Sequence, residues 1–401
     1  MHSKMLRVNF IIPYLVRRGG TIAIYEIANR LQDRNYDVTI TTLAGEFSWF
    51  PLKVKVNYIT RIPNKRLARV FDNLVRAYRG FRGRYTASSL FYFNRLLKIN
   101  LGTGLDLIPY LAENIPDCDV NVATGYSSAF AVYLSGKGRP YHFLQDFPSM
   151  IVEHCDVHGD ICLKMFELSL RLPFYFLTNS MYTRDLVMRH QQDAKIKVVG
   201  VGVDDETFYK RKKNLLERIQ KPKVMALIRA EPKHKGAEVA VKVINKLNKK
   251  LPVHAVLVGS HLDVSKVFSS IKPEFTYICV GTVSNEKLAN LYSSADLFLF
   301  TSYVEGFGLP PLEAMACGTP VVSTDCLGNR DYANNGYNCL LTPPGDVEEL
   351  TEASLRVLTN SDLADRLVRG GLETAKHFTW DKVVDRFEEA LRAPEEDNEI
   401  R

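Results

Sequence analysis

The sequence predicts an α/β protein made of two doubly wound domains, each a parallel sheet with helices on both faces. Three observations predict this fold class. Short apolar segments alternate with helical patterns from end to end, which is typical of parallel sheets. The chain has 401 residues, more than the roughly 250 to 300 that one hydrophobic core usually holds. A polar stretch at 204–222, rich in Lys and Arg, interrupts the apolar pattern near the middle.

The apolar segments predict six strands in each half. In the first half we expect strands at Val8–Ile12, Val38–Thr42, Val54–Ile59, Val120–Ala123, Tyr141–Leu144 and Phe174–Thr178. In the second half we expect Val224–Arg229, Ala255–Val258, Tyr277–Val280, Leu297–Thr301, Val321–Ser323 and Cys339–Leu341. Ligands of doubly wound sheets bind beyond the carboxyl ends of the strands, so we expect a cleft where the two domains meet. The expected domains are 1–205 and 206–378, then a helix at 379–392 and a disordered tail at 393–401.

Composition predicts a globular protein without a membrane span. The chain is 46% apolar, yet no run reaches the roughly 18 apolar residues that a span needs. Residues 6–12 are too short and polar for a secretory signal, so we interpret them as the first strand and expect the mature chain to begin here. Seven cysteines form no Cys-x-x-Cys pair and leave an odd number, which argues against a disulfide framework or a zinc site. We therefore expect reduced cysteines that pack in the core, and a cytoplasmic protein.

The most informative segment, 302–322, joins a predicted strand to a helix. Gly306 and Gly308 allow close backbone approach, the prolines that follow suit a first helical turn, and Gly318 marks the end of that helix. Free N–H groups at the turn and the positive end of the helix dipole favour an anion.

Two glutamates in this segment add a second kind of chemistry. Glu305 and Glu313 can accept hydrogen bonds from neutral hydroxyls. An anion and a polyol together indicate a nucleotide sugar. An ordinary strand–loop–helix with two surface glutamates explains the local pattern alone about as well.

The whole segment closely resembles the donor site of retaining glycosyltransferases of family 4, which have the GT-B fold. The resemblance rests on two glutamates eight apart around Gly-Phe-Gly, with Ala-Cys-Gly-Thr-Pro-Val-Val following. In that family the first glutamate contacts the transferred sugar and the second contacts the nucleotide ribose, so the resemblance assigns these roles to Glu305 and Glu313. It also implies donor contacts from Gly306, Phe307, Gly308 and Leu309. The resemblance covers most of 6–392, and it implies that the helix at 379–392 crosses back to the first domain.

Arg229 and Lys235 form a basic pair across a strand-to-helix loop. A guanidinium fork and a compact ammonium can bind one diphosphate together, although two solvated surface charges are the usual explanation of such a pair. Family 4 enzymes carry an arginine and a lysine at this spacing that bind the donor diphosphate. The resemblance therefore makes Arg229 and Lys235 catalytic residues beside Glu305. Because these two side chains would supply the charge that a metal ion supplies in other glycosyltransferases, we expect no metal and no other cofactor.

Weaker signals complete the predicted donor site. The resemblance implies that Thr282 and Val283 line the base pocket through main-chain groups. Gly19 and Gly20 follow the first strand and could let a loop close against a sugar or diphosphate, although turn formation alone explains them about as well.

The sequence departs from the family pattern after the fifth strand. Family members often have a His-Asp pair there, and the histidine reaches the transferred sugar. Here the strand leads to Gln145 and Asp146, while His142 lies one side-chain alternation away or points into the sheet, where a histidine is more often structural. We expect Gln145 to contact the sugar and Asp146 to lie near the acceptor. A neutral amide cannot act as a base, and retaining transfer of this type is thought to proceed by front-face attack in which the departing phosphate takes the acceptor proton.

Residues 61–100 form a basic segment. They contain ten Lys/Arg residues and one acid, Asp72. A helical wheel places apolar residues opposite a basic face, which suits attachment to an anionic membrane surface. An ordinary solvated helix whose apolar face covers the first domain explains the pattern equally well. The first interpretation would place the protein peripherally on the inner face of the plasma membrane.

Together these observations predict a retaining, metal-independent glycosyltransferase, of hexosyl or deoxyhexosyl type. The expected partners are a nucleotide-diphosphate sugar and a glycan or lipid-linked acceptor, in cell-surface polysaccharide synthesis. One alternative is a GT-B enzyme that glycosylates nucleic acid, but the chain has no nucleic-acid motif, so we expect no such partner. The other is a non-catalytic sugar-nucleotide sensor, which the intact set of Arg229, Lys235, Glu305 and Glu313 disfavours.

Overall fold

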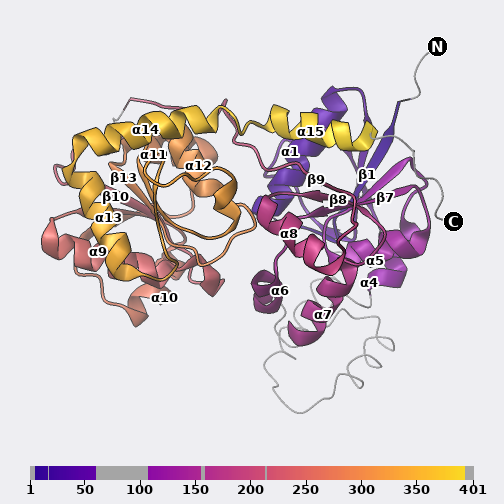
Figure 1. Ribbon diagram of the computed structural model, residues 1–401, viewed down its shortest axis with the longest axis horizontal. Coiled ribbons are helices and arrows are strands. Elements are labelled where there is room, and N and C mark those ends of the chain that lie inside the picture. The colour runs from indigo at the N-terminus through magenta and orange to yellow at the C-terminus, as the bar shows by residue number, and fades with distance from the viewer. Residues whose placement is uncertain (1–4, 17, 60–106, 155–158, 213–214, 393–401) are drawn as a thin grey trace. The chain divides into compact units, whose positions relative to one another are not determined.

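A computed structural model describes residues 5–16, 18–59, 107–154, 159–212 and 215–392 of the chain (Figure 1). The chain divides into two compact units. The first consists of Met1–Leu177 and Leu186–Lys197, and the second of Thr178–Asp185 and Val198–Arg401. The domain boundaries proposed from the sequence, and the packing of the last helix on the first domain, stay predictions.

The first unit contains a seven-stranded sheet in the order β5-β3-β1-β6-β7-β8-β9. Its strands are β1 (Arg7–Ile11), β3 (Asp37–Thr42), β5 (Lys55–Tyr58), β6 (Val120–Ala123), β7 (Arg139–Leu144), β8 (Tyr175–Thr178) and β9 (Ile196–Val198). The pairs from β5 to β7 are parallel. The strand order reverses between β1 and β6, which makes their carboxyl ends the expected ligand edge.

The helices described in this unit are α1 (Gly19–Asp33), α4 (Leu107–Asn114), α5 (Tyr126–Ser135), α6 (Pro148–His154) and α7 (Gly159–Ser169). The residues of α8 (Met181–His190) are divided between the two units. A separate two-stranded sheet pairs β2 (Tyr14–Leu15) with β4 (Ala44–Gly45). Gly19 and Gly20, which we expected in a loop, form the first turn of α1.

The second unit contains a six-stranded sheet in the order β12-β11-β10-β13-β14-β15, with every neighbouring pair parallel. Its strands are β10 (Lys223–Leu227), β11 (His254–Val258), β12 (Thr276–Cys279), β13 (Leu297–Phe300), β14 (Val321–Thr324) and β15 (Leu340–Thr342). Its helices are η1 (Lys233–Lys235), α9 (Ala237–Lys250), α10 (His261–Ser270), α11 (Asn285–Ser294), α12 (Leu309–Ala316), η2 (Gly328–Asp331), α13 (Val347–Thr359), α14 (Ser361–Ala375) and α15 (Trp380–Arg392).

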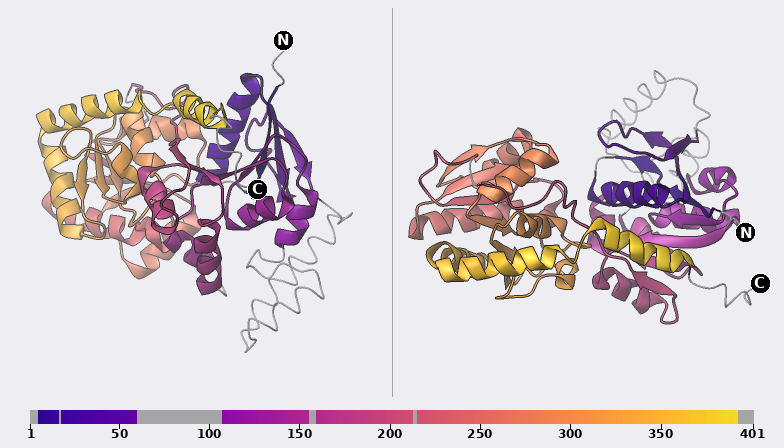
Figure 2. Two further views of the ribbon diagram at one scale, coloured as in Figure 1. Left: turned by 45° about the vertical axis from the view of Figure 1, so that its right-hand side comes forward. Right: turned by 90° about the horizontal axis from the view of Figure 1, so that it is seen from above.

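Helices cover both faces of the second sheet (Figures 1 and 2). Leu297 and Leu299 of β13 belong to a buried cluster that includes residues of α9 and α13. Phe298 between them faces the other way, with its ring centroid 5.1 Å from that of Tyr292 on α11. The alternation explains why β13 is apolar at every position, since both of its faces are buried.

The twelve predicted strands are confirmed, each within about two residues of its expected bounds. The polar strand β9 and the two-residue strands β2 and β4 were not predicted, because their sequences carry too little apolar pattern. The expectation of reduced cysteines is wrong for Cys162, which is disulfide-bonded, whereas five others are free. An odd count excludes full pairing, but it does not exclude one bond.

Two expectations concern membranes. Across the described ranges, no helix has both the length and the apolarity of a membrane span. The basic segment 61–100 lies outside the described residues.

Candidate functional site

The structure brings together two of the predicted residues where the strand order of the second sheet reverses. The neighbouring strands β10 and β13 both end at the same edge of the sheet. Lys235 follows β10, and Glu305 follows β13. The Lys235 ammonium lies 2.9 and 2.8 Å from the two carboxylate oxygens of Glu305. A cation and an anion separated by 70 residues in sequence therefore meet at the position where doubly wound sheets bind ligands.

Close backbone packing holds the Lys235 segment against the end of β13. Gly236 has a φ of 66°, and a Cβ there would lie 2.0 Å from the carbonyl oxygen of Thr301. The Thr301 hydroxyl donates to the Gly236 carbonyl at 2.9 Å, and the Tyr303 N–H donates to the carbonyl of His234 at 2.7 Å. Glycine is required at 236 both for its left-handed φ and for this approach.

Glu305 is buried, with 8% of its surface exposed, and its side chain is fixed by two partners. Besides the Lys235 ammonium, the Ser302 hydroxyl donates to its carboxylate at 2.7 Å. Its own N–H donates to the Cys326 carbonyl at 2.9 Å. The explanation as two surface glutamates is therefore wrong for Glu305, because its carboxylate is buried and is held by an ammonium and a hydroxyl.

The loop after Glu305 presents backbone N–H groups at the start of α12. Gly308 has a φ of 81° and precedes the first helical residue, Leu309. Prolines occupy the next two positions and carry no N–H, so they add no donors to the turn. The N–H groups of Phe307, Gly308 and Leu309 have no hydrogen-bond partner in the described part of the chain. They are available to an anion.

The Phe307 side chain does not take part in this binding surface. It is 4% exposed and packs 5.3 Å from the Tyr332 ring and 6.1 Å from the Phe378 ring, between centroids. Its expected donor contact can come through its main chain.

Glu313 lies on α12 and is partly buried. The Tyr292 hydroxyl donates to its carboxylate at 3.4 Å. Burial raises the pKa of Glu313 to about 7, and the hydrogen bond from Tyr292 opposes that rise. Both the protonated and the ionised forms of Glu313 are accessible near neutral pH, and either can accept from a hydroxyl.

The other predicted residues of the second unit lie along the same edge of the sheet. Arg229 is exposed just beyond β10 and makes no ion pair with any described residue. Thr282 and Val283 follow β12, two strands from β10. The Gly259 N–H donates to the Gly281 carbonyl at 3.2 Å and so joins the ends of β11 and β12. No hydrogen bond or ion pair joins these residues to the Lys235–Glu305 pair within the described ranges.

The predicted residues of the first unit gather at its own ligand edge. The Gln145 amide donates to the Gly20 carbonyl at 3.1 Å. A Cβ on Gly125 would lie 3.5 Å from a carboxylate oxygen of Asp146. Burial raises the pKa of Asp146 to about 7, with the charge of Arg18 opposing the rise. The ends of β6 and β7 and the start of α1 thus bring Gly20, Gln145 and Asp146 together, whereas Gly19 is exposed with open space around it.

His142 is a core residue, as we expected. It is fully buried, its ring packs edge-on to Phe174 with centroids 6.2 Å apart, and neither ring nitrogen has a partner among the described residues. Burial lowers its pKa to about 3, which keeps the imidazole neutral.

Sequence reasoning missed the residues that hold the site in shape. Ser302, Tyr292 and Thr301 carry polar groups that touch Glu305, Glu313 and Gly236. Ser302 lies in the segment 302–322 that the sequence singled out. Its role, like those of Tyr292 and Thr301, depends on a contact that only the fold creates. Within the described residues, no group of three or more His, Cys, Asp or Glu side chains could hold a metal ion.

Residues 208–374 match the family model described as glycosyl transferases group 1. A D-inositol 3-phosphate glycosyltransferase from Saccharomonospora viridis is 37% identical over 112 residues, which are 27% of this chain and 26% of the relative. An O-antigen chain mannosyltransferase B from Escherichia coli is 35% identical over 102 residues, 25% of this chain and 26% of the relative. The chain thus spans about a quarter of the length of these curated relatives.

The fold resembles that of solved proteins, glycosyltransferases among them, over nearly the whole chain. HepE from Anabaena, solved in complex with UDP and glucose, superposes with a TM-score of 0.71 over 97% of this chain and 100% of its own, at 18% identity. The molecule therefore has the GT-B fold, with two parallel-sheet α/β units. The resemblance to glycosyltransferases is confirmed at the level of group 1, and membership of family 4 stays a prediction.

Proposed function

We propose that this protein is a retaining glycosyltransferase that moves a sugar from a nucleotide-diphosphate sugar to a glycan or lipid-linked acceptor. The observation that carries the proposal is the Lys235–Glu305 ion pair at the reversal of strand order in the second sheet. The ammonium can bind phosphate, and the carboxylate beside it can accept hydrogen bonds from sugar hydroxyls. The relatives named as glycosyltransferases support the transfer chemistry, and HepE with UDP and glucose supports the class of donor.

The proposed roles follow from charge and hydrogen-bonding capacity. Lys235 and Arg229 bind the diphosphate and stabilise the negative charge that grows on it as the sugar leaves. The N–H groups of residues 307–309 supply further donors at the positive end of α12. Glu305 accepts from hydroxyls of the transferred sugar, and Glu313 accepts from the ribose.

When the donor binds, the Lys235 ammonium has to donate hydrogen bonds both to Glu305 and to the diphosphate. In the structure its ammonium contacts both oxygens of Glu305. An ammonium has three N–H donors, so it can keep one on the carboxylate and direct the others to phosphate. Glu305 would then be held in place while the diphosphate is neutralised.

We propose front-face transfer without a metal ion. The acceptor hydroxyl attacks on the side from which the diphosphate departs, and the departing phosphate oxygen takes its proton. The two basic side chains supply the charge that a divalent ion supplies in metal-dependent enzymes. Gln145 would contact the sugar from the first unit, and Asp146 would lie near the acceptor.

The wider setting is also a proposal. O-antigen synthesis in a named relative supports a hexosyl or deoxyhexosyl transfer in cell-surface polysaccharide synthesis. The basic residues of 61–100 would attach a cytoplasmic protein to the inner, anionic face of the membrane, close to a lipid-linked acceptor.

Donor binding and turnover test the proposal in two steps. UDP-, GDP- and dTDP-sugars are screened by thermal shift, since a ligand at 100 times its Kd stabilises the folded state by about 2.7 kcal/mol. The donor that binds is then incubated with and without acceptor while release of free nucleotide is measured. We expect nucleotide release, and we expect it to persist in EDTA. Binding without any release would favour a sensor, and an absolute need for a divalent ion would contradict the metal-free mechanism.

A further inference from the structure

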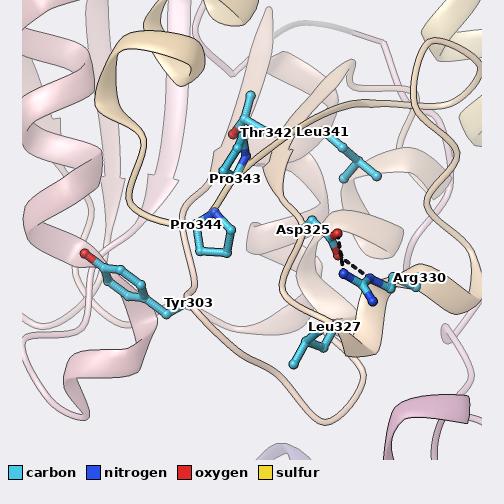
Figure 3. Close-up of a pocket in the computed structure, with 8 residues that line it drawn as sticks. All are labelled: Tyr303, Asp325, Leu327, Arg330, Leu341, Thr342, Pro343 and Pro344. Atoms are coloured by element: carbon cyan, nitrogen blue, oxygen red, sulfur yellow. Dashed lines mark hydrogen bonds and ion pairs between the residues drawn. The ribbon is translucent and has the colours of Figure 1, made fainter.

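A cavity of about 520 Å³ lies beside the loop that carries Glu305 (Figure 3). It is lined by Tyr303, Asp325, Leu327, Arg330, Leu341, Thr342, Pro343 and Pro344. Apart from the Tyr303 N–H, which donates to the His234 carbonyl, none of these residues has a role in the donor site described above. Its volume is in the range of small-molecule sites.

The polar part of the cavity is an ion pair with no net charge. Arg330 donates through two nitrogens to the two carboxylate oxygens of Asp325, both at 2.7 Å. This contact holds the pKa of Asp325 below its usual range, so the pair stays ionised. Because the carboxylate neutralises the guanidinium, the pair suits neutral hydroxyl groups better than a phosphate. Its remaining N–H groups and lone pairs can both be used, since 60% of the Arg330 side chain and 33% of the Asp325 side chain are exposed.

The apolar part of the cavity offers flat surfaces. Tyr303 is 45% exposed, and its ring rests on Gly345, where a Cβ would come within 2.9 Å of a ring carbon. Pro344 stands next to it, with the ion pair across the cavity (Figure 3). An aromatic ring and a proline facing hydroxyl-binding groups fit a pyranose, which has C–H faces and a rim of hydroxyls.

Two residues that line the cavity are close to Glu305 through the main chain. Tyr303 precedes Glu305 by two residues, so their Cα atoms are at most about 7 Å apart. Leu327 forms a parallel bridge with Glu305 and has a φ of 67°, which is rare for a residue with a branched side chain. A ligand in the cavity would therefore lie next to the loop that holds the proposed sugar contact.

We propose that this cavity is a subsite for a neutral pyranose unit of a glycan acceptor, adjacent to the unit that receives the transferred sugar. This proposal adds a substrate subsite to the proposed function. It rests on that function for the identification of the bound glycan as an acceptor. The binding of a neutral oligosaccharide to the cavity stands independently of catalysis.

The test uses gluco-, manno- and galacto-oligosaccharides of two, three and four units, at millimolar concentration with the full-length protein. Saturation-transfer NMR detects which ones bind without nucleotide. We expect Tyr303→Ala and Arg330→Gln to weaken that binding at least about tenfold. The matched control is Tyr277→Ala, because Tyr277 is 44% exposed on β12, at the opposite edge of the same sheet. It should bind as the wild type does.

Other outcomes would change this assignment of the cavity or the proposed function. Absence of binding by the wild type to every oligosaccharide overturns the subsite, and so does equal binding by all variants. Displacement of the oligosaccharide by saturating sugar nucleotide would assign the cavity to the donor's sugar instead. If oligosaccharides bind through Tyr303 while no sugar nucleotide is ever bound or cleaved, the subsite stands and the proposed function fails.

Discussion

Glu305 and Glu313 differ in their surroundings, and the difference separates their expected roles. Glu305 is buried between the Lys235 ammonium and the Ser302 hydroxyl. Glu313 contacts the Tyr292 hydroxyl at 3.4 Å. In the proposed roles, Glu305 meets the positive charge that develops on the sugar, whereas the contact of Glu313 with the ribose is the same before and during the reaction.

We expect Glu305→Gln to lower kcat strongly and Glu313→Gln to act mainly on KM for the donor. The amide keeps the size of the carboxylate but loses its charge, and in the proposed roles only Glu305 faces charge that changes during transfer. Steady-state kinetics with varied donor measure both parameters. The reverse division of effects between the two variants would exchange or abolish the roles.

The raised pKa of Glu313, about 7 against 4.5, predicts how stability varies with pH. Between these two values the folded state binds more protons than the unfolded state, so the free energy of unfolding falls as pH rises through this window. One proton contributes a slope of at most about 1.4 kcal/mol per pH unit. Urea unfolding at pH 5 and pH 7.5 should show a smaller loss in Glu313→Gln than in the wild type. The exposed Glu238→Gln serves as control, and an equal loss in all three proteins would contradict the assigned pKa.

At the scale of elements, the turn between η1 and α9 positions Lys235. Gly236 and Gly336 share a left-handed φ, 66° and 78°, but only Gly236 has backbone where a Cβ would go. Alanine at either position meets a cost of about 1–2 kcal/mol for the left-handed conformation.

We expect Gly236→Ala to lower the free energy of unfolding by about 3 kcal/mol or more and to weaken donor binding, because the Lys235 segment has to move off β13. Gly336→Ala should show the smaller loss and normal donor binding. Denaturant unfolding and a donor titration of both variants check this. Equal losses would mean that the contact with Thr301 is unimportant.

The elements could largely be predicted from the sequence, and the reason is visible in β13. Its four apolar residues are buried on both faces, so the local sequence reports the final environment. β9 has a lysine at its centre and is only partly buried, so no such signal exists. The residues of the donor loop were predictable because they form one continuous segment. Ser302, Gly236 and the Asp325–Arg330 pair were not, because their roles depend on which strand ends become neighbours.

At the scale of the whole molecule, the basic residues of 61–100 give a prediction about membranes. Replacing five of these residues with Gln should reduce binding to anionic vesicles and use of a lipid-linked acceptor. The five are Lys65, Arg66, Arg69, Arg76 and Arg79. Added salt should weaken wild-type binding, since the Debye length falls from about 10 Å at 0.1 M to about 3 Å at 1 M. Co-sedimentation measures this, with a soluble acceptor analogue as control. Equal sedimentation of the two proteins would leave the segment as a solvated helix face.

The proposed function requires a diphosphate-binding pair of cations beside a sugar-binding carboxylate at the edge of the second sheet. If this is correct, Arg229 and Lys235 act on the charge that develops in the transition state. Lys233 lies in the same turn as Lys235 and is exposed, so it offers a control of equal charge in nearly the same place.

The most direct measurement is turnover at saturating donor for Arg229→Ala, Lys235→Ala and Lys233→Ala. We expect the first two to lose about 10²- to 10³-fold in kcat, the scale for removing one preorganised donor to developing charge. Lys233→Ala should keep its turnover, because the Lys233 ammonium makes no ion pair with any described residue and has no proposed role. Near wild-type turnover in Arg229→Ala or Lys235→Ala would contradict the proposed roles.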